Sequence, residues 1–333
     1  MSNILEVAEK AGVSPTTVSH VINNTRFVSE ATRARVLAAM DELGYRPNAL
    51  ARSLRRGQTH TLGLILPDSA NPFFAEVGRM IEDTAFERGY SVVLCNTEGD
   101  FNKEHLYIDV LGKKQVDGLI FVASGEQTDS LRALLRRKLP VVIVDRDVPG
   151  NEVDAVLTDN RQGGHLATRH LISLGHRRIG CIAGPSHLTP SEQRVIGYRS
   201  ALEEAGIAID DSLIMRGDFH PESGRVATRD FLRRPDPPTA VFACNDLMAL
   251  GALRAAAEAN RRVPADLAVV GFDDIELASY TIPPLTTIAQ PKADMGRLAV
   301  HILIERMGDK ARAPRRELLP TRLVVRGSCG GQA

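Results

Sequence analysis

The chain has 333 residues, of which 43% are hydrophobic and 25% charged, and its 41 basic side chains balance 41 acidic ones. These values are typical of a globular protein with two or three compact units, and no apolar run approaches the ~18 residues that a membrane span needs. No basic segment followed by an apolar one is present at the N-terminus, so no secretory signal and a cytoplasmic location are expected.

The four cysteines are far apart and form no C-x-x-C pair: Cys95, Cys181, Cys244 and Cys329. This spacing disfavours a zinc site or a disulfide framework and suits a reducing compartment. The charge is unevenly distributed, because residues 1–60 contain eight Lys and Arg against five Asp and Glu. This modest basic excess fits either a polyanionic partner or an ordinary solvated surface.

Three short helices are predicted in residues 1–46, the first predicted domain. The first helix ends at Gly12, the second follows the cap Ser14 and Pro15, and the third follows the cap Ser29. Two short helices joined by a glycine turn match a helix-turn-helix, whose second helix enters the DNA major groove.

Thr16, Thr17 and His20 lie on the polar face near the start of the second helix. Hydroxyl and imidazole groups at this place reach base edges when such a helix enters the major groove. These three residues are therefore the predicted base-reading residues. The alternative, a three-helix bundle that binds nothing, stays open on spacing alone.

Residues 47–60 are predicted to be a hinge helix and linker. The stretch 49–56 has good helix formers, but eight residues are too few for a stable isolated helix, so it needs a packing partner. Leu54 lies between Arg52 and Arg55, which suggests an apolar wedge for the DNA minor groove flanked by phosphate-binding arginines. A plain linker with a chance leucine is the competing interpretation.

Residues 61–333 alternate apolar strands with helices, which predicts parallel sheets covered on both faces. The predicted strands are Leu62–Leu66, Ser91–Cys95, Gly118–Phe121, Val141–Val144, Arg178–Ala183, Ile214–Arg216, Ala240–Ala243 and Ala268–Phe272. We expect two doubly wound lobes, with the chain crossing between them near 159–161 and 283–290. Residues 327–333 are expected to form a disordered tail.

Polar residues follow the apolar strands directly, where open α/β sheets bind ligands. Those predicted to converge on one cleft, with Arg194 and Gln290 from flanking segments, are Asn71, Asp145, Arg146, Asn245 and Asp273. Phe73, Phe74 and Phe219 supply aromatic faces. Carboxylates, amides, arginines and aromatic rings together suit a small polyol such as a sugar. Helix capping and ordinary core packing are the competing roles of the single residues.

No motif of a catalytic or nucleotide-binding site is present, such as G-x-x-x-x-G-K-[ST], G-x-G-x-x-G, G-x-S-x-G or H-E-x-x-H. His165, His170 and His176 do not have the spacing of a metal site. The sequence therefore predicts a protein that is not an enzyme and that needs no cofactor or metal.

The N-terminal run Val7-Ala8…Ala11-Gly12-Val13-Ser14-Pro15-Thr16-Thr17-Val18-Ser19-His20 and the segment Ala49-Leu50-Ala51-Arg52-Ser53-Leu54 resemble the LacI/GalR family of bacterial transcription regulators. The resemblance covers essentially the whole chain. It implies an α/β fold with a helix-turn-helix headpiece and a two-lobed regulatory region like that of periplasmic binding proteins.

The resemblance also implies a nucleoid-associated homodimeric repressor that binds palindromic operator DNA and no membrane. The runs Leu94–Asp100, Phe272–Ser279 and Pro283–Ile288 are most similar to ribose-responsive members of the family. D-Ribose is therefore the implied effector, releasing the operator by closing the lobes. Its implied ligands are Asn71, Phe73, Phe74, Asp145, Arg146, Arg194, Phe219, Asn245, Asp273 and Gln290.

The main rival prediction is a family member that responds to another sugar or to a purine corepressor. A purine pocket needs broader aromatic stacking and groups matched to base edges, whereas the Asp145-Arg146 pair favours hydroxyls. Two other classes, a sugar-modifying enzyme and a free sugar carrier, are disfavoured because neither accounts for the predicted helix-turn-helix.

Overall fold

The structure is a computed structural model that describes residues 3–46, 58–122, 132, 134–135, 137–147 and 153–331. The chain divides into two compact units, Met1–Thr59 and His60–Ala333. Leu54, Arg52 and Arg55, predicted to meet the DNA minor groove, lie outside the described residues. No helix within the described ranges is long and apolar enough to cross a membrane.

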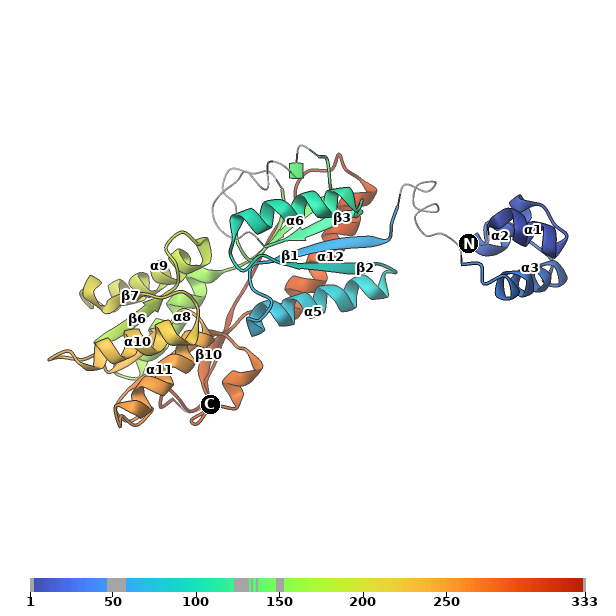
Figure 1. Cartoon of the computed structure of the whole chain (residues 1–333). Helices are drawn as coiled ribbons and strands as arrows, with labels where there is room; N and C mark the ends of the chain where they lie inside the picture. Colours follow the sequence, from blue (N-terminus) through green and yellow to red (C-terminus); the bar gives the residue numbers. More distant parts are fainter. Residues whose placement is uncertain are drawn as a thin grey trace. The chain divides into compact units, whose positions relative to one another are not determined.

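The N-terminal unit has three helices around a small apolar core (Figure 1): α1 (Ile4–Ala11), α2 (Pro15–Asn23) and α3 (Glu30–Glu42). Gly12 ends α1 in the left-handed conformation, with a φ of 62°. The Oγ of Ser14 then caps α2 by accepting a hydrogen bond from the Thr17 N–H at 3.1 Å. The buried core consists of Val7, Ala8, Ala11, Val18, Val21, Val36 and Ala39.

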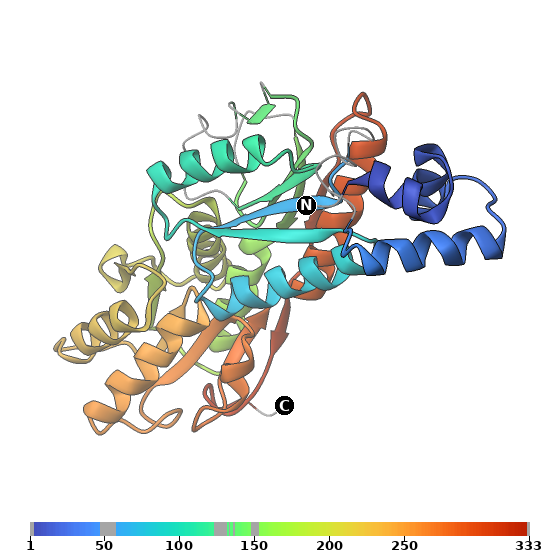
Figure 2. The same cartoon turned by 45° about the vertical axis from the view of Figure 1, so that its right-hand side comes forward.

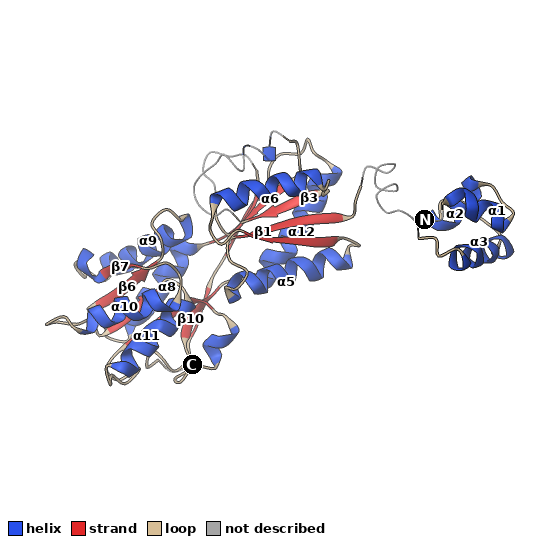
Figure 3. Ribbon diagram, viewed as in Figure 1, coloured by secondary structure: helices blue, strands red, loops and turns tan. Residues whose placement is uncertain are grey.

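The larger unit has two six-stranded sheets, one in each lobe, with helices on both faces of each sheet (Figure 3). All strand pairs of the first sheet are parallel. Its strands, in spatial order, are β11 (Arg316–Leu319), β5 (Asp154–Thr158), β4 (Val141–Val144), β3 (Gly118–Phe121), β1 (Thr61–Leu66) and β2 (Ser91–Asn96). Its helices are α5 (Pro72–Glu87), α6 (Phe101–Lys113) and α12 (Lys292–Gly308).

Alternate residues of β1 enter opposite apolar layers, as expected for a strand between two helical layers. Leu62 and Leu64 join the cluster that includes α5, whereas Ile65 joins the cluster with Ile108 and Leu111 of α6. Both views of the molecule show α5 beside α12 (Figures 1 and 2).

The second sheet is parallel except for β12, which runs antiparallel to β10. Its strands, in spatial order, are β12 (Arg322–Val324), β10 (Thr286–Ala289), β9 (Ala268–Asp273), β8 (Ala240–Ala243), β6 (Ile179–Ala183) and β7 (Ile214–Arg216). Its helices are α8 (Asn160–Ser173), α9 (Thr189–Glu204), α10 (Pro221–Leu232) and α11 (Asp246–Glu258), with short 3₁₀ helices at Asp211–Leu213 and Glu276–Ser279.

The helices α8 and α9 pack closely because glycine allows their backbones to meet. A Cβ at Gly164 of α8 would lie 2.1 Å from the carbonyl oxygen of Arg194 on α9. Any larger residue at position 164 would therefore push α9 away. This close contact fixes the distance between the backbones of α8 and α9 at Arg194.

The chain crosses between the lobes three times. It leaves the first sheet after β5 at Asp159, returns between β10 and α12, and crosses again at Pro320 and Thr321 between β11 and β12. The third crossing is absent from the sequence prediction, since β5, β10, β11 and β12 were not among the predicted strands.

The expectation of a disordered tail is wrong for its described part. Ser328 is fully buried and Cys329 is 2% exposed. The Ser328 hydroxyl donates to the Val269 carbonyl at 2.6 Å and accepts from the Thr286 N–H at 2.8 Å. A polar segment is ordered here because it satisfies backbone groups at the edges of β9 and β10.

Candidate functional site

A cleft lies between the lobes, at the carboxyl ends of strands from both sheets. Its inner chamber has a volume of about 30 Å³ and is lined by Asn71, Phe73, Phe74, Asp145, Arg146, Leu188, Pro190, Arg194, Phe219, Asn245 and Asp273. Nine of the ten predicted ligand residues are in this set. The tenth, Gln290, contacts it by donating from Nε2 to Asp273 Oδ1 at 2.8 Å.

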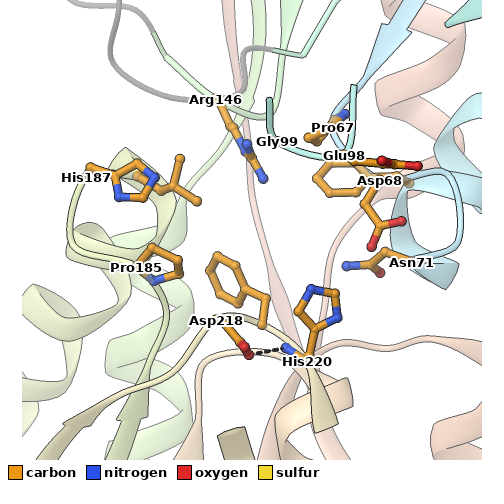
Figure 4. Close-up of a pocket in the computed structure, with 13 residues that line it drawn as sticks. Pro67, Asp68, Asn71, Glu98, Gly99, Arg146, Pro185, His187, Asp218 and His220 are labelled. Atoms are coloured by element: carbon orange, nitrogen blue, oxygen red, sulfur yellow. Dashed lines mark hydrogen bonds between the residues drawn. The ribbon is translucent and has the colours of Figure 1, made fainter. Parts of the chain in front are cut away.

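An outer chamber of about 320 Å³ adjoins the inner one and shares Asn71, Phe74, Arg146, Leu188 and Phe219 with it. Arg146 points into this space from one lobe, and His187 and His220 face it from the other (Figure 4). The outer volume falls within the range of small-molecule sites, whereas the inner chamber holds about one or two waters. A sugar ring in the inner chamber therefore requires some movement of the side chains or lobes.

Two asparagines of the inner chamber also cap the helices that follow them. Asn71 Oδ1 accepts from the Phe73 N–H at 3.0 Å, and Asn245 Oδ1 accepts from the Met248 N–H at 2.9 Å. Asn245 Nδ2 donates to the Phe219 carbonyl at 2.9 Å. Capping and cleft lining are thus compatible, because a side-chain amide has separate accepting and donating ends.

Three residues of the inner chamber have a positive φ although they carry side chains: Asp145 at 66°, Phe219 at 69° and Asp273 at 115°. Such backbone costs of order 1–3 kcal/mol each and persists where the surroundings enforce it. All three residues line the inner chamber, so the surrounding structure holds strained backbone at this cleft.

Two arginines and two aspartates dominate the electrostatics of the inner chamber. Arg194 Nη1 lies 3.8 Å from Asp273 Oδ1, and Arg146 Nε lies 3.9 Å from Asp145 Oδ2. Burial raises the pKa of Asp273 to about 6 and also raises the pKa of Asp145, against the opposing effect of the arginines. The Arg194 guanidinium stacks on Phe272 with 3.7 Å to the ring centroid.

Two buried acceptors of this cluster have no hydrogen-bond partner among the described residues, Asp145 Oδ1 and Gln290 Oε1. Unsatisfied buried acceptors cost about 1–3 kcal/mol each. Of the two residues, Asp145 lines the inner chamber, so a ligand that donates hydroxyl groups there is able to satisfy its Oδ1.

Asn160 and Asp246 lie behind the cleft wall and were not among the predicted ligand residues. Asn160 Oδ1 accepts from Arg194 Nε at 2.8 Å. Asp246 is fully buried and accepts from Thr287 Oγ1 at 2.6 Å and from the Ile275 N–H at 2.9 Å. Asp246 follows Asn245 in the sequence, which was a usable signal, whereas the Asn160 contact joins residues 34 positions apart.

The predicted base-reading residues lie together on α2 of the N-terminal unit. Thr16 is exposed, and Thr17 shares a 2.9 Å hydrogen bond with the hydroxyl of the cap Ser14. His20 Nδ1 is 2.8 Å from Thr25 Oγ1, so its orientation is fixed from one side. This leaves Nε2 as the imidazole nitrogen available to an external partner.

Comparison with known proteins matches a family to each of the two units. The sequence model of "Bacterial regulatory proteins, lacI family" matches residues 3–48, and that of "Periplasmic binding protein-like domain" matches residues 168–329. The ribose operon repressor of Escherichia coli strain K12 is 46% identical over 98% of this chain and 100% of its own length. The chain belongs to the LacI family of bacterial regulatory proteins.

Other LacI-family proteins are similar at comparable levels. The PurR repressor of Photobacterium profundum is 44% identical over 98% of both chains. A solved structure of the Lac repressor dimer bound to operator is 33% identical, has a TM-score of 0.87, and covers 98% of this chain and 99% of its own. The chain is thus a DNA-binding repressor of the LacI family, not an enzyme, and its α/β fold with helix-turn-helix and two parallel-sheet lobes is confirmed.

Proposed function

We propose that the protein is a homodimeric repressor of a sugar-utilisation operon that D-ribose releases from a palindromic operator. It acts on nucleoid DNA in the bacterial cytoplasm. Thr16, Thr17 and His20 read base edges, and Leu54, with Arg52 and Arg55, meets the minor groove. The ten residues of the predicted ligand set bind the sugar between the lobes.

The DNA-binding part of the proposal is supported by the exposed polar face of α2 and by relatives that are repressors. In the Lac repressor structure, the protein is a dimer on its operator. Two-fold symmetry in the protein requires two-fold symmetry in the half-sites, so a palindromic operator follows from a homodimer.

The observation that carries the effector assignment is the buried acceptor Asp145 Oδ1, which has no hydrogen-bond partner among the described residues and lines the inner chamber together with Arg146 and Arg194. A pentose offers several hydroxyls that donate to this acceptor and accept from the guanidinium groups. The faces of Phe74 and Phe219 are able to cover its C–H groups.

A purine corepressor is the second candidate, because PurR of Photobacterium profundum is 44% identical to this chain. The aromatic residues that line the inner chamber are Phe73, Phe74 and Phe219. Phe73 and Phe74 meet edge-on, with centroids 5.1 Å apart and an interplanar angle of 64°. These two rings therefore do not form a parallel stack for a planar base, and the sugar is preferred because its hydroxyls match the acceptor Asp145 Oδ1.

Calorimetric titration with ribose, hypoxanthine and guanine tests the assignment. Ribose is expected to release heat, and Arg146→Ala to weaken its binding by about 10- to 100-fold through loss of a charged hydrogen-bond donor. Arg254→Ala, on the exposed face of α11, serves as the control. Heat from the purines alone would reject the ribose assignment.

The sign of the response is tested by operator binding with and without ribose. We expect weaker binding with ribose by about 5- to 150-fold, the usual scale of such coupling. Tighter binding with the sugar would identify a corepressor instead.

A further inference from the structure

We propose that Asn160 is a positioning residue that couples occupation of the cleft to the orientation of the two lobes. The inference rests on the proposed function, since it takes Arg194 as an effector ligand. It assigns to Asn160 a role in transmitting the signal rather than in contacting the effector.

Asn160 is the first residue of α8 and directly follows Asp159, where the chain leaves the first lobe. Its side chain is buried, at 6% exposure. Oδ1 accepts from Arg194 Nε at 2.8 Å, and Nδ2 donates to the Thr158 carbonyl at 3.0 Å. One amide therefore joins a cleft arginine to the end of β5.

The two partners of this amide belong to different lobes. Arg194 is carried by α9 of the second lobe, where its guanidinium also stacks on Phe272 and donates to the Cys244 carbonyl. Thr158 ends β5 of the first lobe, and its hydroxyl contacts Met295 Sδ of α12 at 3.5 Å. Asn160 thus links the cleft arginine to the first lobe across the crossing itself.

This link makes the position of Arg194 dependent on the crossing. An effector that draws the guanidinium towards itself changes the direction of Nε, and Asn160 then keeps both hydrogen bonds only if the backbone at Asp159 rotates. Hinges of this kind consist of a few residues that absorb the change in φ and ψ. The Gln162–Thr321 hydrogen bond also spans a crossing, but neither residue lines the cleft.

Two variants separate the two halves of the link. Asn160→Ala removes both hydrogen bonds, whereas Asn160→Asp still accepts from Arg194 but, as a carboxylate, no longer donates to Thr158. Arg161→Ala changes the neighbouring exposed residue of α8 and is the control. Effector affinity is measured by calorimetry with ribose, or with hypoxanthine if only hypoxanthine releases heat.

Operator affinity of the full chain is then measured with and without saturating effector. In wild type and Arg161→Ala we expect the full effector-dependent change. In both Asn160 variants we expect that change to fall to less than about twofold, with the effector Kd of Asn160→Asp within about tenfold of wild type. A full effector-dependent change in both Asn160 variants overturns the proposal.

A measurement on the free protein keeps this test independent of the effector. Spin labels at Glu82→Cys on α5 and Ala257→Cys on α11 report the distance between the lobes, and dilution into unlabelled protein restricts the signal to one subunit. Asn160→Ala should broaden the distance distribution relative to Arg161→Ala. Identical distance distributions contradict the role of Asn160. If neither ribose nor hypoxanthine releases heat in calorimetry, only the proposed function is contradicted.

Discussion

Gln290 Nε2 donates a 2.8 Å hydrogen bond to Asp273 Oδ1, and both side chains are buried. Asp273 ends β9 and Gln290 follows β10, the neighbouring strand of the second sheet. The bond links the ends of two neighbouring strands, one of which supplies Asp273 to the cleft. It also holds a carboxylate in a place where burial opposes its charge.

The Asp273 carboxylate should make the stability of the free protein depend on pH. Its folded-state pKa of about 6 lies above the ordinary value of 3.8, so the folded state binds the proton more tightly. The stabilisation from this group is complete below pH ~4 and is lost as the pH rises through ~6. Asp273→Asn should therefore have a higher free energy of unfolding than wild type at pH 7, by on the order of 1–3 kcal/mol.

Urea denaturation of both proteins between pH 4 and 8 measures this difference. We expect it to shrink towards pH 4, where the wild-type carboxyl is protonated in the folded state and about half protonated in the unfolded state. A difference of the same size at every pH would show that the charge of Asp273 is not its cause.

Arg194→Met should weaken ribose binding strongly. Methionine keeps much of the apolar stem but removes the charged donor, and it leaves Asp273 without its nearest cation. Hydrogen bonds to charged groups are worth about 1.5–3 kcal/mol, so we expect a Kd about 10- to 150-fold higher. Calorimetry measures this, with exposed Arg161→Met as the matched control; equal affinity in the two variants would remove Arg194 from the ligand set.

Thr25→Val should weaken operator binding through His20. The lost hydrogen bond to Nδ1 frees the orientation and tautomer of the ring, and a net bond of about 0.5–1.5 kcal/mol corresponds to roughly 2- to 12-fold in affinity. Thr25→Ser keeps the hydroxyl and should bind like wild type.

If His20 reads a base pair as proposed, the loss in Thr25→Val should be confined to that base pair, with the salt dependence of binding unchanged, since no phosphate contact is removed. Operator variants substituted at single base pairs locate the effect. A uniform loss across all operators would show a general change in the N-terminal unit instead.

Ser328→Ala should lower the free energy of unfolding by about 2–3 kcal/mol. The substitution removes the donor to the Val269 carbonyl and leaves the buried Thr286 N–H unsatisfied. Chemical denaturation measures the loss. Wild-type stability of Ser328→Ala would show that this segment contributes nothing to the fold.

The alternation of apolar strands and helices predicted most strands of the parallel sheets because those strands are buried on both faces. The short buried strands β5 and β10 were nevertheless missed. The strands β11 and β12 were not predicted because they are short and partly exposed. The segment Arg316–Leu319 also begins with two charged residues, which is not typical of a buried strand. The tail was mispredicted because Ser328 is ordered by partners 42 and 59 residues away. Such pairings have no signature in local composition.

The cleft was more predictable than the groups behind it. Asn71, Asp145, Asn245 and Asp273 follow or end strands, and the ends of parallel strands meet at one edge, so their convergence follows from the fold class. Asn160 and Thr287 instead depend on which side chains meet after the lobes have folded. Only the folded structure shows which of these side chains contact each other.

The three crossings have a consequence for how this protein can be divided. Neither lobe corresponds to a continuous stretch of sequence, since α12 and β11 complete the first and β12 returns to the second. A fragment cut at Asp159 would lack an edge strand and a covering helix of its own sheet. A fusion that joins this two-lobed unit to another DNA-binding domain therefore has to include residues 60–331 as one continuous segment.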